Sequence, residues 1–283
     1  MSSVAHLRLQ DIATAQVRTV LPEMPVRDAV RIFSAEHISS LVIAREARPL
    51  GILTERDLVN LLAQGISLDK PVGEVMSTAL LTANRSLDFA SAQLMMLERG
   101  VRHLVLVDDD GCLCGLATET DFRRRVGKDL LHLLGQLGRV MDHAGTLLDP
   151  AVPLAQVVQL MAAGRLDYVL AGREGRAEGI LTERDISRLL LEGIPAETTS
   201  MGAVMHQPLI SITLGCSVID VAARMEQEQI RHLVVVDDGG RCLGVVSQHR
   251  LLEKLGFALA EERRGRVMHD MEMIMATTGV GLW

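Results

Sequence analysis

The amino-acid sequence repeats itself with a period of about 64 residues. The segment GILTERDL at residues 51–58 returns as GILTERDI at residues 179–186, with seven of the eight positions identical. Weaker copies, GLATETDF and GVVSQHRL, occupy residues 115–122 and 244–251. The glycines that open these segments follow one another at steps of 64, 64 and 65 residues. A repeat of this kind constrains the chain to fold as four similar units.

A second pair of segments supports the same phase. RHLVLVDD at residues 102–109 parallels RHLVVVDD at residues 231–238, which begins 129 residues, or two periods, later. The corresponding segments of repeats 1 and 3 are SLVIA at residues 40–44 and YVLA at residues 168–171. Apolar runs that end in an acidic, glycine-containing turn predict a β-strand followed by a hairpin.

Each repeat predicts the element order β-α-β-β-α. The first element is a short β-rich segment, such as residues 80–82 or 209–212. The hairpin leads into the Thr/Ser motif, and a second helix closes the repeat. In repeat 2 the apolar face of the first helix is predicted to consist of Leu87, Ala90, Leu94 and Leu97.

The repeats are expected to pair. A single unit of about 60 residues buries too little surface to be stable alone. The fold class is therefore α/β (α+β), with two pairs of repeats that close into one disk or dimerise. The first pair is expected at residues 1–128, with repeats at about 10–66 and 70–128. The second pair is expected at residues 129–260, with repeats at about 138–195 and 200–258.

The Thr-x-x-Asp motif allows two interpretations. Thr54 and Asp57 have the spacing of a capping box, in which they would bond each other's backbone at a helix N-terminus. The same geometry suits a ligand, because a helix N-terminus offers unpaired N–H groups to a phosphate. A carboxylate there can accept hydrogen bonds from two ribose hydroxyls. The sequence alone leaves both interpretations open.

The motif, the Arg-His-Leu-Val strand and the period together resemble the cystathionine-β-synthase (CBS) repeat. The resemblance covers residues from about 10 to 258. It implies two pseudo-twofold pairs, often called Bateman modules, which commonly bind AMP, ADP, ATP or S-adenosylmethionine in the cleft between repeats. Such modules regulate a partner domain and are not themselves enzymes. A magnesium ion can accompany a bound nucleotide, and no tightly bound cofactor is expected.

The resemblance also implies binding residues by position. The ribose acids would be Asp57, Asp121 and Asp185. The hydroxyls beside ribose and phosphate would be Thr54, Thr118, Thr182 and Ser247. The cationic phosphate contacts would be Arg102, His103, Arg231 and His232. A rim position at the start of a strand would explain these four residues equally well. Repeat 4 departs from the pattern because Arg250 replaces the acid, so its site is empty or its guanidinium reaches a neighbouring phosphate.

Composition excludes several other classes of protein. The net charge of -7 argues against a nucleic-acid binder. No apolar stretch reaches the length of about 18 residues that a membrane span needs, and the N-terminus has no signal-peptide core, which indicates the cytoplasm. The four cysteines and nine histidines do not form a metal-site pattern. No catalytic motif is present, so no catalytic residue is assigned.

The C-terminal region predicts a signalling helix. Leu251, Leu252, Leu255 and Leu259 form an apolar stripe, and a second stripe follows beyond Gly265. Such a helix either packs on its own module or pairs between two chains, and the second interpretation favours a homodimer. Residues 261–283 are expected to be a helical linker whose end, GVGLW, is similar to the start of a PAS domain. This similarity predicts a longer chain with an output domain, such as a diguanylate cyclase or a histidine kinase.

Two functions remain open at this stage. The first is a sensor of an adenine-containing small molecule. The alternative is a scaffold with empty clefts whose role is dimerisation. Three intact Thr-x-x-Asp motifs favour the sensor, and Arg250 favours the scaffold.

Overall fold

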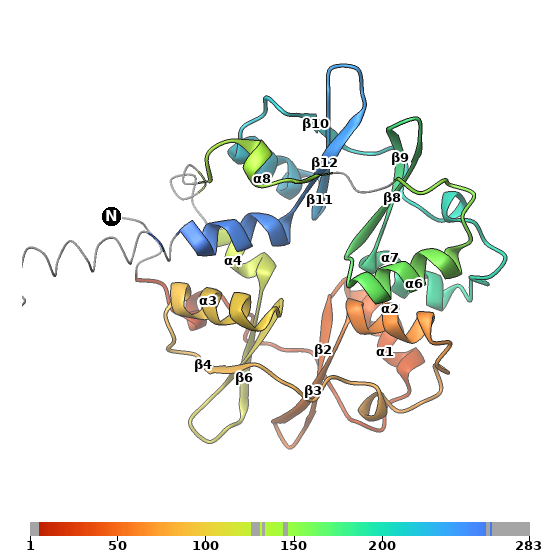
Figure 1. The fold of residues 1–283 in the computed structure, drawn as a ribbon. Coiled ribbons are helices and arrows are strands. Elements are labelled where there is room, and N and C mark those ends of the chain that lie inside the picture. The colour runs from red at the N-terminus through yellow and green to blue at the C-terminus, as the bar shows by residue number, and fades with distance from the viewer. Residues whose placement is uncertain (1–5, 126–130, 132–133, 144–146, 259–260, 262–283) are drawn as a thin grey trace, which may run out of the picture.

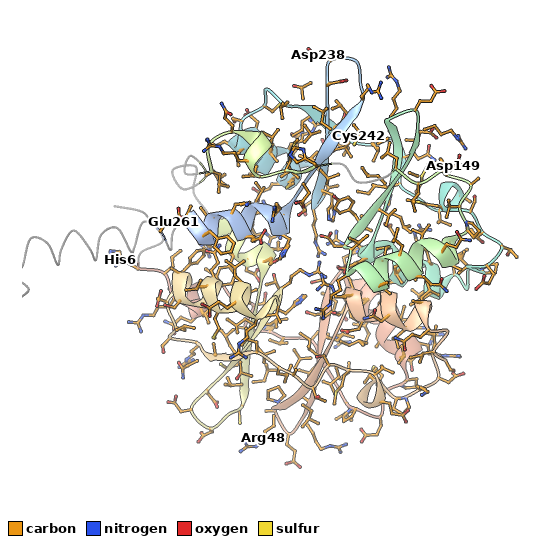
Figure 2. The ribbon with its side chains drawn as sticks, viewed as in Figure 1. His6, Arg48, Asp149, Asp238, Cys242 and Glu261 are labelled. Atoms are coloured by element: carbon orange, nitrogen blue, oxygen red, sulfur yellow. The ribbon has the colours of Figure 1, made fainter. Side chains whose placement is uncertain are left out.

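The computed structural model describes residues 6–125, 131, 134–143, 147–258 and 261 of the chain. Four repeats, each with a small sheet and two helices, surround a common centre (Figure 1). The two modules, repeats 1 and 2 and repeats 3 and 4, close into one disk within the chain. Figure 2 shows Arg48, the first residue of a hairpin strand, and Asp238, in another hairpin turn, at opposite outer ends of the disk.

The first module has the predicted order of elements in both repeats. Repeat 1 consists of β1 (Thr19–Val20), α1 (Val26–Glu36), β2 (Ser40–Arg45), β3 (Arg48–Thr54) and α2 (Glu55–Ala63). Repeat 2 consists of β4 (Thr82–Asn84), α3 (Phe89–Arg99), β5 (His103–Val107), β6 (Leu113–Thr118) and α4 (Glu119–Arg125). In each repeat the first strand is parallel to the second, and the last two strands form an antiparallel hairpin.

The second module repeats this order with one difference. Repeat 3 consists of α6 (Leu154–Gly164), β8 (Tyr168–Arg173), β9 (Arg176–Thr182) and α7 (Glu183–Leu191). Its first strand is reduced to a single parallel bridge between Leu148 and Ala171. Repeat 4 consists of β10 (Ser211–Thr213), α8 (Val218–Gln227), β11 (His232–Val236), β12 (Cys242–Ser247) and a closing helix at residues 248–258. The α/β fold class with β-α-β-β-α repeats is confirmed.

Repeats 3 and 4 exchange the segments that precede them. The segment before repeat 3 forms β7 (Asp142–His143), which pairs with β12 of repeat 4. The segment before repeat 4 pairs in return with repeat 3, through a bridge between His206 and Ile180. Module 1 makes the same exchange through the bridges Thr14–Leu116 and Ile52–Ser77. Each repeat therefore completes its partner's sheet, which ties the two repeats of a module together.

Helix faces join one module to the other. Helices of repeats 1 and 3 share a core that includes Phe33, Leu58 and Ile186. Helices of repeats 2 and 4 share a second core that includes Phe89 and Leu252. Fully burying a side chain of this kind contributes about 1.5–3 kcal/mol. The disk is therefore closed by hydrophobic contacts between modules, in the order repeat 1, repeat 2, repeat 4, repeat 3.

Sheet faces join the two repeats within each module. In module 1 the contact includes Val42, Ile52 and Val105. In module 2 it includes Leu170 and Val234. These two smaller clusters lie between the sheets of each module.

Two details of the sequence prediction were wrong. The first strands of repeats 2 and 4 begin at Thr82 and Ser211, at the end or in the middle of the predicted segments. Helix α3 starts at Phe89 because the Asp88 carboxylate accepts a hydrogen bond from the Ser91 N–H at 3.0 Å and caps the helix. Leu87 therefore lies before the helix. The face of α3 that packs into the core is Phe89, Ala92, Gln93 and Met96, and Leu94 is 37% exposed.

The described part of the C-terminal stripe packs inside the chain. Leu251, Leu252 and Leu255 are buried against repeat 2 in the closing helix. Leu259 and nearly all of the expected linker, including the PAS-like end at residues 262–283, lie outside the described residues. Among the described residues, no helix is long and apolar enough to cross a membrane.

The segment exchange predicts the effect of one glycine substitution. A Cβ atom at Gly244 would lie 2.3 Å from the backbone carbonyl oxygen of Asp142 in β7. This oxygen cannot move without breaking the β7–β12 pairing. Gly244→Ala is therefore expected to lower the free energy of unfolding by about 1–3 kcal/mol in denaturant titrations.

Gly215→Ala is the matched control, because a Cβ atom there meets no heavy atom within 4 Å. Its unfolding curve is expected to lie close to that of the wild type. Equal midpoints for the two variants would contradict the close approach of β7 to Gly244.

Candidate functional site

The Thr-x-x-Asp motifs of repeats 1 and 3 form capping boxes, and in repeat 2 the acid makes the same bonds to its threonine. The Asp57 carboxylate accepts hydrogen bonds from the Thr54 N–H and hydroxyl, both at 2.7 Å. Asp121 accepts from Thr118 at 2.8 and 2.7 Å, and Asp185 accepts from Thr182 at 2.8 Å twice. Each of these bonds ends on Oδ2, so the capping role takes one carboxylate oxygen. The ribose role remains a prediction for the other oxygen.

Repeat 4 keeps the helix cap, and Arg250, which replaces the acid, pairs with other residues of the chain. The Ser247 hydroxyl accepts a hydrogen bond from the Arg250 N–H at 3.0 Å. The Arg250 guanidinium forms ion pairs with Asp142, at 3.1 Å, and with Glu253. Arg250 is thus held by two carboxylates of its own chain.

The motif also places two buried glutamates at the centre of the disk. Glu55 and Glu183 follow Thr54 and Thr182 directly and are 4% and 3% exposed. Together with four arginines they form what we call the central cluster: Glu55, Glu183, Arg56, Arg102, Arg184 and Arg231.

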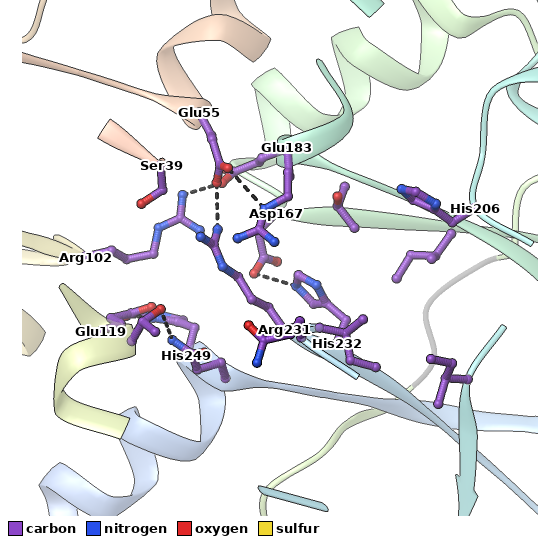
Figure 3. Close-up of a pocket in the computed structure, with 18 of the residues that line it drawn as sticks. Ser39, Glu55, Arg102, Glu119, Asp167, Glu183, His206, Arg231, His232 and His249 are labelled. Atoms are coloured by element: carbon purple, nitrogen blue, oxygen red, sulfur yellow. Dashed lines mark hydrogen bonds and ion pairs between the residues drawn. The ribbon is translucent and has the colours of Figure 1, made fainter. Parts of the chain in front are cut away.

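The ion pairs of the central cluster cross from one module to the other (Figure 3). Glu183 pairs with Arg56, at 3.1 Å, and with Arg102, both from module 1. Glu55 pairs with Arg184, at 3.4 Å, and with Arg231, at 2.6 Å, both from module 2. Two of the four predicted phosphate contacts, Arg102 and Arg231, therefore already bind carboxylates. Sequence analysis missed the glutamates, although their identity in repeats 1 and 3 was a visible signal.

The two predicted histidines differ in their surroundings. His103 Nε2 lies 3.1 Å from the Ser39 hydroxyl oxygen, and His232 Nε2 lies 3.0 Å from an Asp167 carboxylate oxygen. Burial, with the nearby charges of Arg102 and Arg231, lowers the pKa of His103 to about 3. His103 is therefore neutral at physiological pH and supplies no positive charge to a phosphate.

Repeats 2 and 4 also meet across the centre. Glu119, at the start of α4, lies 2.5 Å from His249 Nδ1 in the closing helix. This hydrogen bond raises the pKa of His249, whereas burial opposes it. Gln248 donates to the Thr120 hydroxyl at 3.1 Å and so adds a second contact between the modules.

A cavity of about 380 Å³ lies in module 2 and extends into the disk centre. Its apolar lining residues lie at the junction of repeats 3 and 4: Ile180, Leu209, Ile210, Ile230 and Val234. Its cationic lining residues belong to the central cluster: Arg102, Arg184 and Arg231. Figure 3 shows Arg102 and Arg231 near the glutamates, with His206 on the other side of the cavity.

The predicted residues are distributed unevenly around this cavity. It is lined by Thr118, Thr182, Arg102, His103, Arg231 and His232. Thr54 and Ser247, with the three predicted ribose acids, do not line it; Asp185 follows two residues after the lining residue Glu183. The geometry thus brings two of the predicted hydroxyls, three guanidinium groups and an apolar wall to one cavity.

Asp185 differs from Asp57 in having a histidine partner. His206 Nε2 lies 2.6 Å from Asp185 Oδ1. Burial raises the pKa of both acids, but at Asp185 the hydrogen bond and charge of His206, with the Thr182 bonds, outweigh burial and lower it. At Asp57 burial prevails over the Thr54 hydrogen bonds, and the pKa is raised.

These elements define a family of repeat proteins. The chain belongs to the CBS domain family, whose model matches residues 9–64, 72–128, 137–192 and 201–256. The uncharacterized protein MK0525 of Methanopyrus kandleri is 35% identical over 121 residues, which cover 41% of this chain and 62% of MK0525. The CBS domain-containing protein YhcV of Bacillus subtilis is 32% identical over 111 residues, which cover 39% of this chain and 76% of YhcV.

A solved structure has the same four-repeat fold. The crystal structure of MJ1225 from Methanocaldococcus jannaschii matches with a TM-score of 0.77 and 22% identity, over 87% of this chain and 99% of that one. An uncharacterized conserved protein from Pyrococcus horikoshii matches with a TM-score of 0.61 and 20% identity, over 88% and 100%. At this level of identity the similarity shows the fold alone.

The central cluster predicts a large cost for removing one carboxylate. Glu183→Gln leaves the guanidinium groups of Arg56 and Arg102, which are 30% and 17% exposed, without their counter-charge. The free energy of unfolding is expected to fall by about 3 kcal/mol. Glu178→Gln is the control, because its pair with Arg173 is at the surface and contributes about 1 kcal/mol or less. Similar losses in chemical denaturation would contradict the role of the cluster.

The Glu119–His249 pair predicts a pH-dependent stability. Because the folded pKa of His249 is raised, the pair stabilises the fold fully below the ordinary histidine pKa of about 6.5. This stabilisation is lost as the pH rises through the raised value. The difference in melting temperature between the wild type and Glu119→Gln is therefore expected to shrink from about pH 6 to about pH 9. A constant or growing difference would contradict the assignment.

Proposed function

We propose that this chain is a regulatory module that senses an adenosine nucleotide or S-adenosylmethionine. The ligand site is the cavity of module 2. The observation that carries this proposal is the combination, in one cavity of about 380 Å³, of an apolar wall and a cationic region. Small-molecule sites have volumes of about 300–1,000 Å³, are mostly apolar and hold a few polar groups that fix orientation.

The cavity matches the parts of a nucleotide in order. The apolar wall, which includes Ile180 and Leu209, suits an adenine ring. The Thr182 hydroxyl and the nearby Asp185 carboxylate suit the ribose hydroxyls. Arg102 and Arg231 suit the phosphates, because guanidinium groups bind phosphate oxygens in pairs. Magnesium would accompany a di- or triphosphate; no group of three or more metal-binding side chains occurs in the described part of the chain.

A ligand in this site would contact residues of both modules. Arg102 belongs to module 1 and Arg231 to module 2, and both bind glutamates across the centre. A phosphate would compete with Glu55 and Glu183 for these arginines, so binding would change the ion pairs that join the modules. The closing helix at residues 248–258 would carry this change towards an output domain of a longer chain. That domain would be a PAS-linked diguanylate cyclase or histidine kinase, working as a homodimer.

The second candidate function is a scaffold without ligand. The scaffold function is favoured because the motif residues stabilise the fold. The three acids cap helices, and Arg250 pairs with Asp142. Binding experiments separate the two functions, because a scaffold needs no nucleotide.

The sensor function predicts a selective effect of Arg231→Ala. Losing a charge-assisted hydrogen bond to phosphate costs about 1.5–3 kcal/mol, so the affinity for AMP is expected to fall about ten- to a hundredfold. The affinity for adenosine, which has no phosphate, is expected to change about threefold or less. Isothermal titration calorimetry with both ligands measures the ratio, in which a general loss of structure cancels.

Arg241→Ala is the matched control, because Arg241 is exposed at the β11–β12 turn. It is expected to leave both affinities unchanged. Absence of binding by the wild type to AMP, ATP and S-adenosylmethionine would overturn the sensor and favour the scaffold. Equal losses for AMP and adenosine in Arg231→Ala would overturn the phosphate role of this residue.

A further inference from the structure

The exchanged segments place one equivalent residue beside the hairpin of each partner repeat. In module 1 the Ser77 N–H donates to the Ile52 carbonyl at 2.9 Å. In module 2 the His206 N–H donates to the Ile180 carbonyl at 2.8 Å. The segments VMST at residues 75–78 and VMHQ at residues 204–207 confirm that Ser77 and His206 occupy the same position.

In module 2 this position carries a charge that complements the acid position of the partner repeat. His206 faces Asp185, at 2.6 Å. In the other half of module 2 the polarity is reversed, since Asp142 of the exchanged segment faces Arg250, at 3.1 Å. Module 1 has the neutral Ser77 at this position, paired with Ile52. The two pairs of module 2 are thus the same contact made with opposite charges.

The His206 contact uses the oxygen of Asp185 that the capping box leaves available. Asp185 Oδ2 accepts from the Thr182 N–H and hydroxyl, both at 2.8 Å. Asp185 Oδ1 is then taken by His206. A ribose diol that binds this carboxylate needs Oδ1, because Oδ2 already accepts two hydrogen bonds. The imidazole and the ribose therefore require the same atom.

We propose that His206 is a self-ligand of Asp185, which a nucleoside must displace to reach the ribose position of module 2. This inference rests on the proposed function, because it names the competitor at the same site. It assigns His206, which sequence analysis did not single out, as a residue that determines the affinity of the cavity. It also distinguishes this site from any site at Asp57, where Ser77 offers no charge.

The exposure of the two residues allows such a displacement. The Asp185 side chain is 3% exposed and is fixed by the capping box, whereas the His206 side chain is 67% exposed. His206 can therefore turn away into solvent without opening the core. His206 lines the cavity and Asp185 does not, so movement of the imidazole would give a ligand in the cavity access to the carboxylate.

The competition depends on pH in a defined direction. The charged groups that act on His206 are Asp185, whose hydrogen bond and charge raise its pKa, and Arg188 on the same helix, which opposes them. Glu183 and Arg184 of α7 and Asp167 before β8 line the same cavity. At pH values below the raised pKa, the imidazolium holds Asp185 as an ion pair. Above it, the neutral ring competes less strongly, so nucleoside affinity increases as the pH rises.

The test compares adenosine binding to the wild type and to His206→Ser, which gives module 2 the residue of module 1. Adenosine is used because it has no phosphate that titrates in this range. At about pH 6 the variant is expected to bind adenosine about three- to tenfold more tightly, the effect of losing a charged hydrogen bond whose histidine side is exposed. At about pH 8.5 the two affinities are expected to converge. His143→Ser, which removes an exposed histidine from β7, is the control and should behave as the wild type.

Each other outcome has a distinct meaning. Weaker binding by His206→Ser would show that His206 contacts the nucleoside, and would overturn the self-ligand. Equal affinities at both pH values would also overturn it, while leaving the proposed function intact. No binding by any of the three proteins at either pH would overturn the proposed function itself.

A measurement without ligand tests the pair directly. The ring protons of His206 report its pKa by nuclear magnetic resonance in the wild type and in Asp185→Asn. The pKa is expected to be lower in the variant, because Asp185 is the main cause of its increase. An unchanged value would overturn the contact on which the inference depends.

Discussion

The fold depends on two buried carboxylates that find their counter-charges in the opposite module. Glu55 and Glu183 are almost fully buried, and an ionised carboxylate in such a place is strongly destabilising unless it is paired. Because their arginine partners lie across the centre, neither module satisfies these groups alone. The hydrophobic helix faces supply most of the attraction between modules, and the central cluster fixes their register, since carboxylate and guanidinium must meet within hydrogen-bonding distance.

The segment exchange links this architecture to the site. Each motif glycine leaves room for the segment that the partner repeat contributes. At Gly179, for example, an added Cβ would lie 2.3 Å from the Met205 sulfur, and at Gly51 it would lie 2.3 Å from the Met76 sulfur. At Gly51 the added Cβ would also lie 2.9 Å from the Ser77 backbone carbonyl oxygen, which cannot move aside as a methionine side chain can. The glycine therefore leaves room for the protein's own chain. The residue that follows each methionine, Ser77 or His206, is carried to the edge of the hairpin as a consequence.

The sequence predicted the features that are local or that recur at the repeat period. Thr54 and Asp57 cap their helix because both groups lie within one turn, so spacing alone was sufficient. The partners of Glu183 could not be predicted in this way, because Arg56 lies 127 residues away and meets it only when the disk closes. The contact between His206 and Asp185 likewise requires the exchanged segment. The error at Leu94 arose because the leucines and the set Phe89, Ala92 and Met96 both have helical spacing, and tertiary packing decides which face is buried.

The charge of the central cavity would favour an anionic ligand. Four guanidinium groups meet two carboxylates in the central cluster, and the nearby acids Glu119 and Asp167 are hydrogen-bonded to His249 and His232. Four guanidinium groups outnumber the two carboxylates, so the cluster retains an excess of positive charge. A phosphate entering the cavity would neutralise part of this excess and favour protonation of His249, whose pKa the Glu119 hydrogen bond already raises. His249 and Glu119 also join repeats 2 and 4. The charge of the ligand would therefore change the ion pairs at both junctions between the modules. An uncharged nucleoside would not change them by its charge.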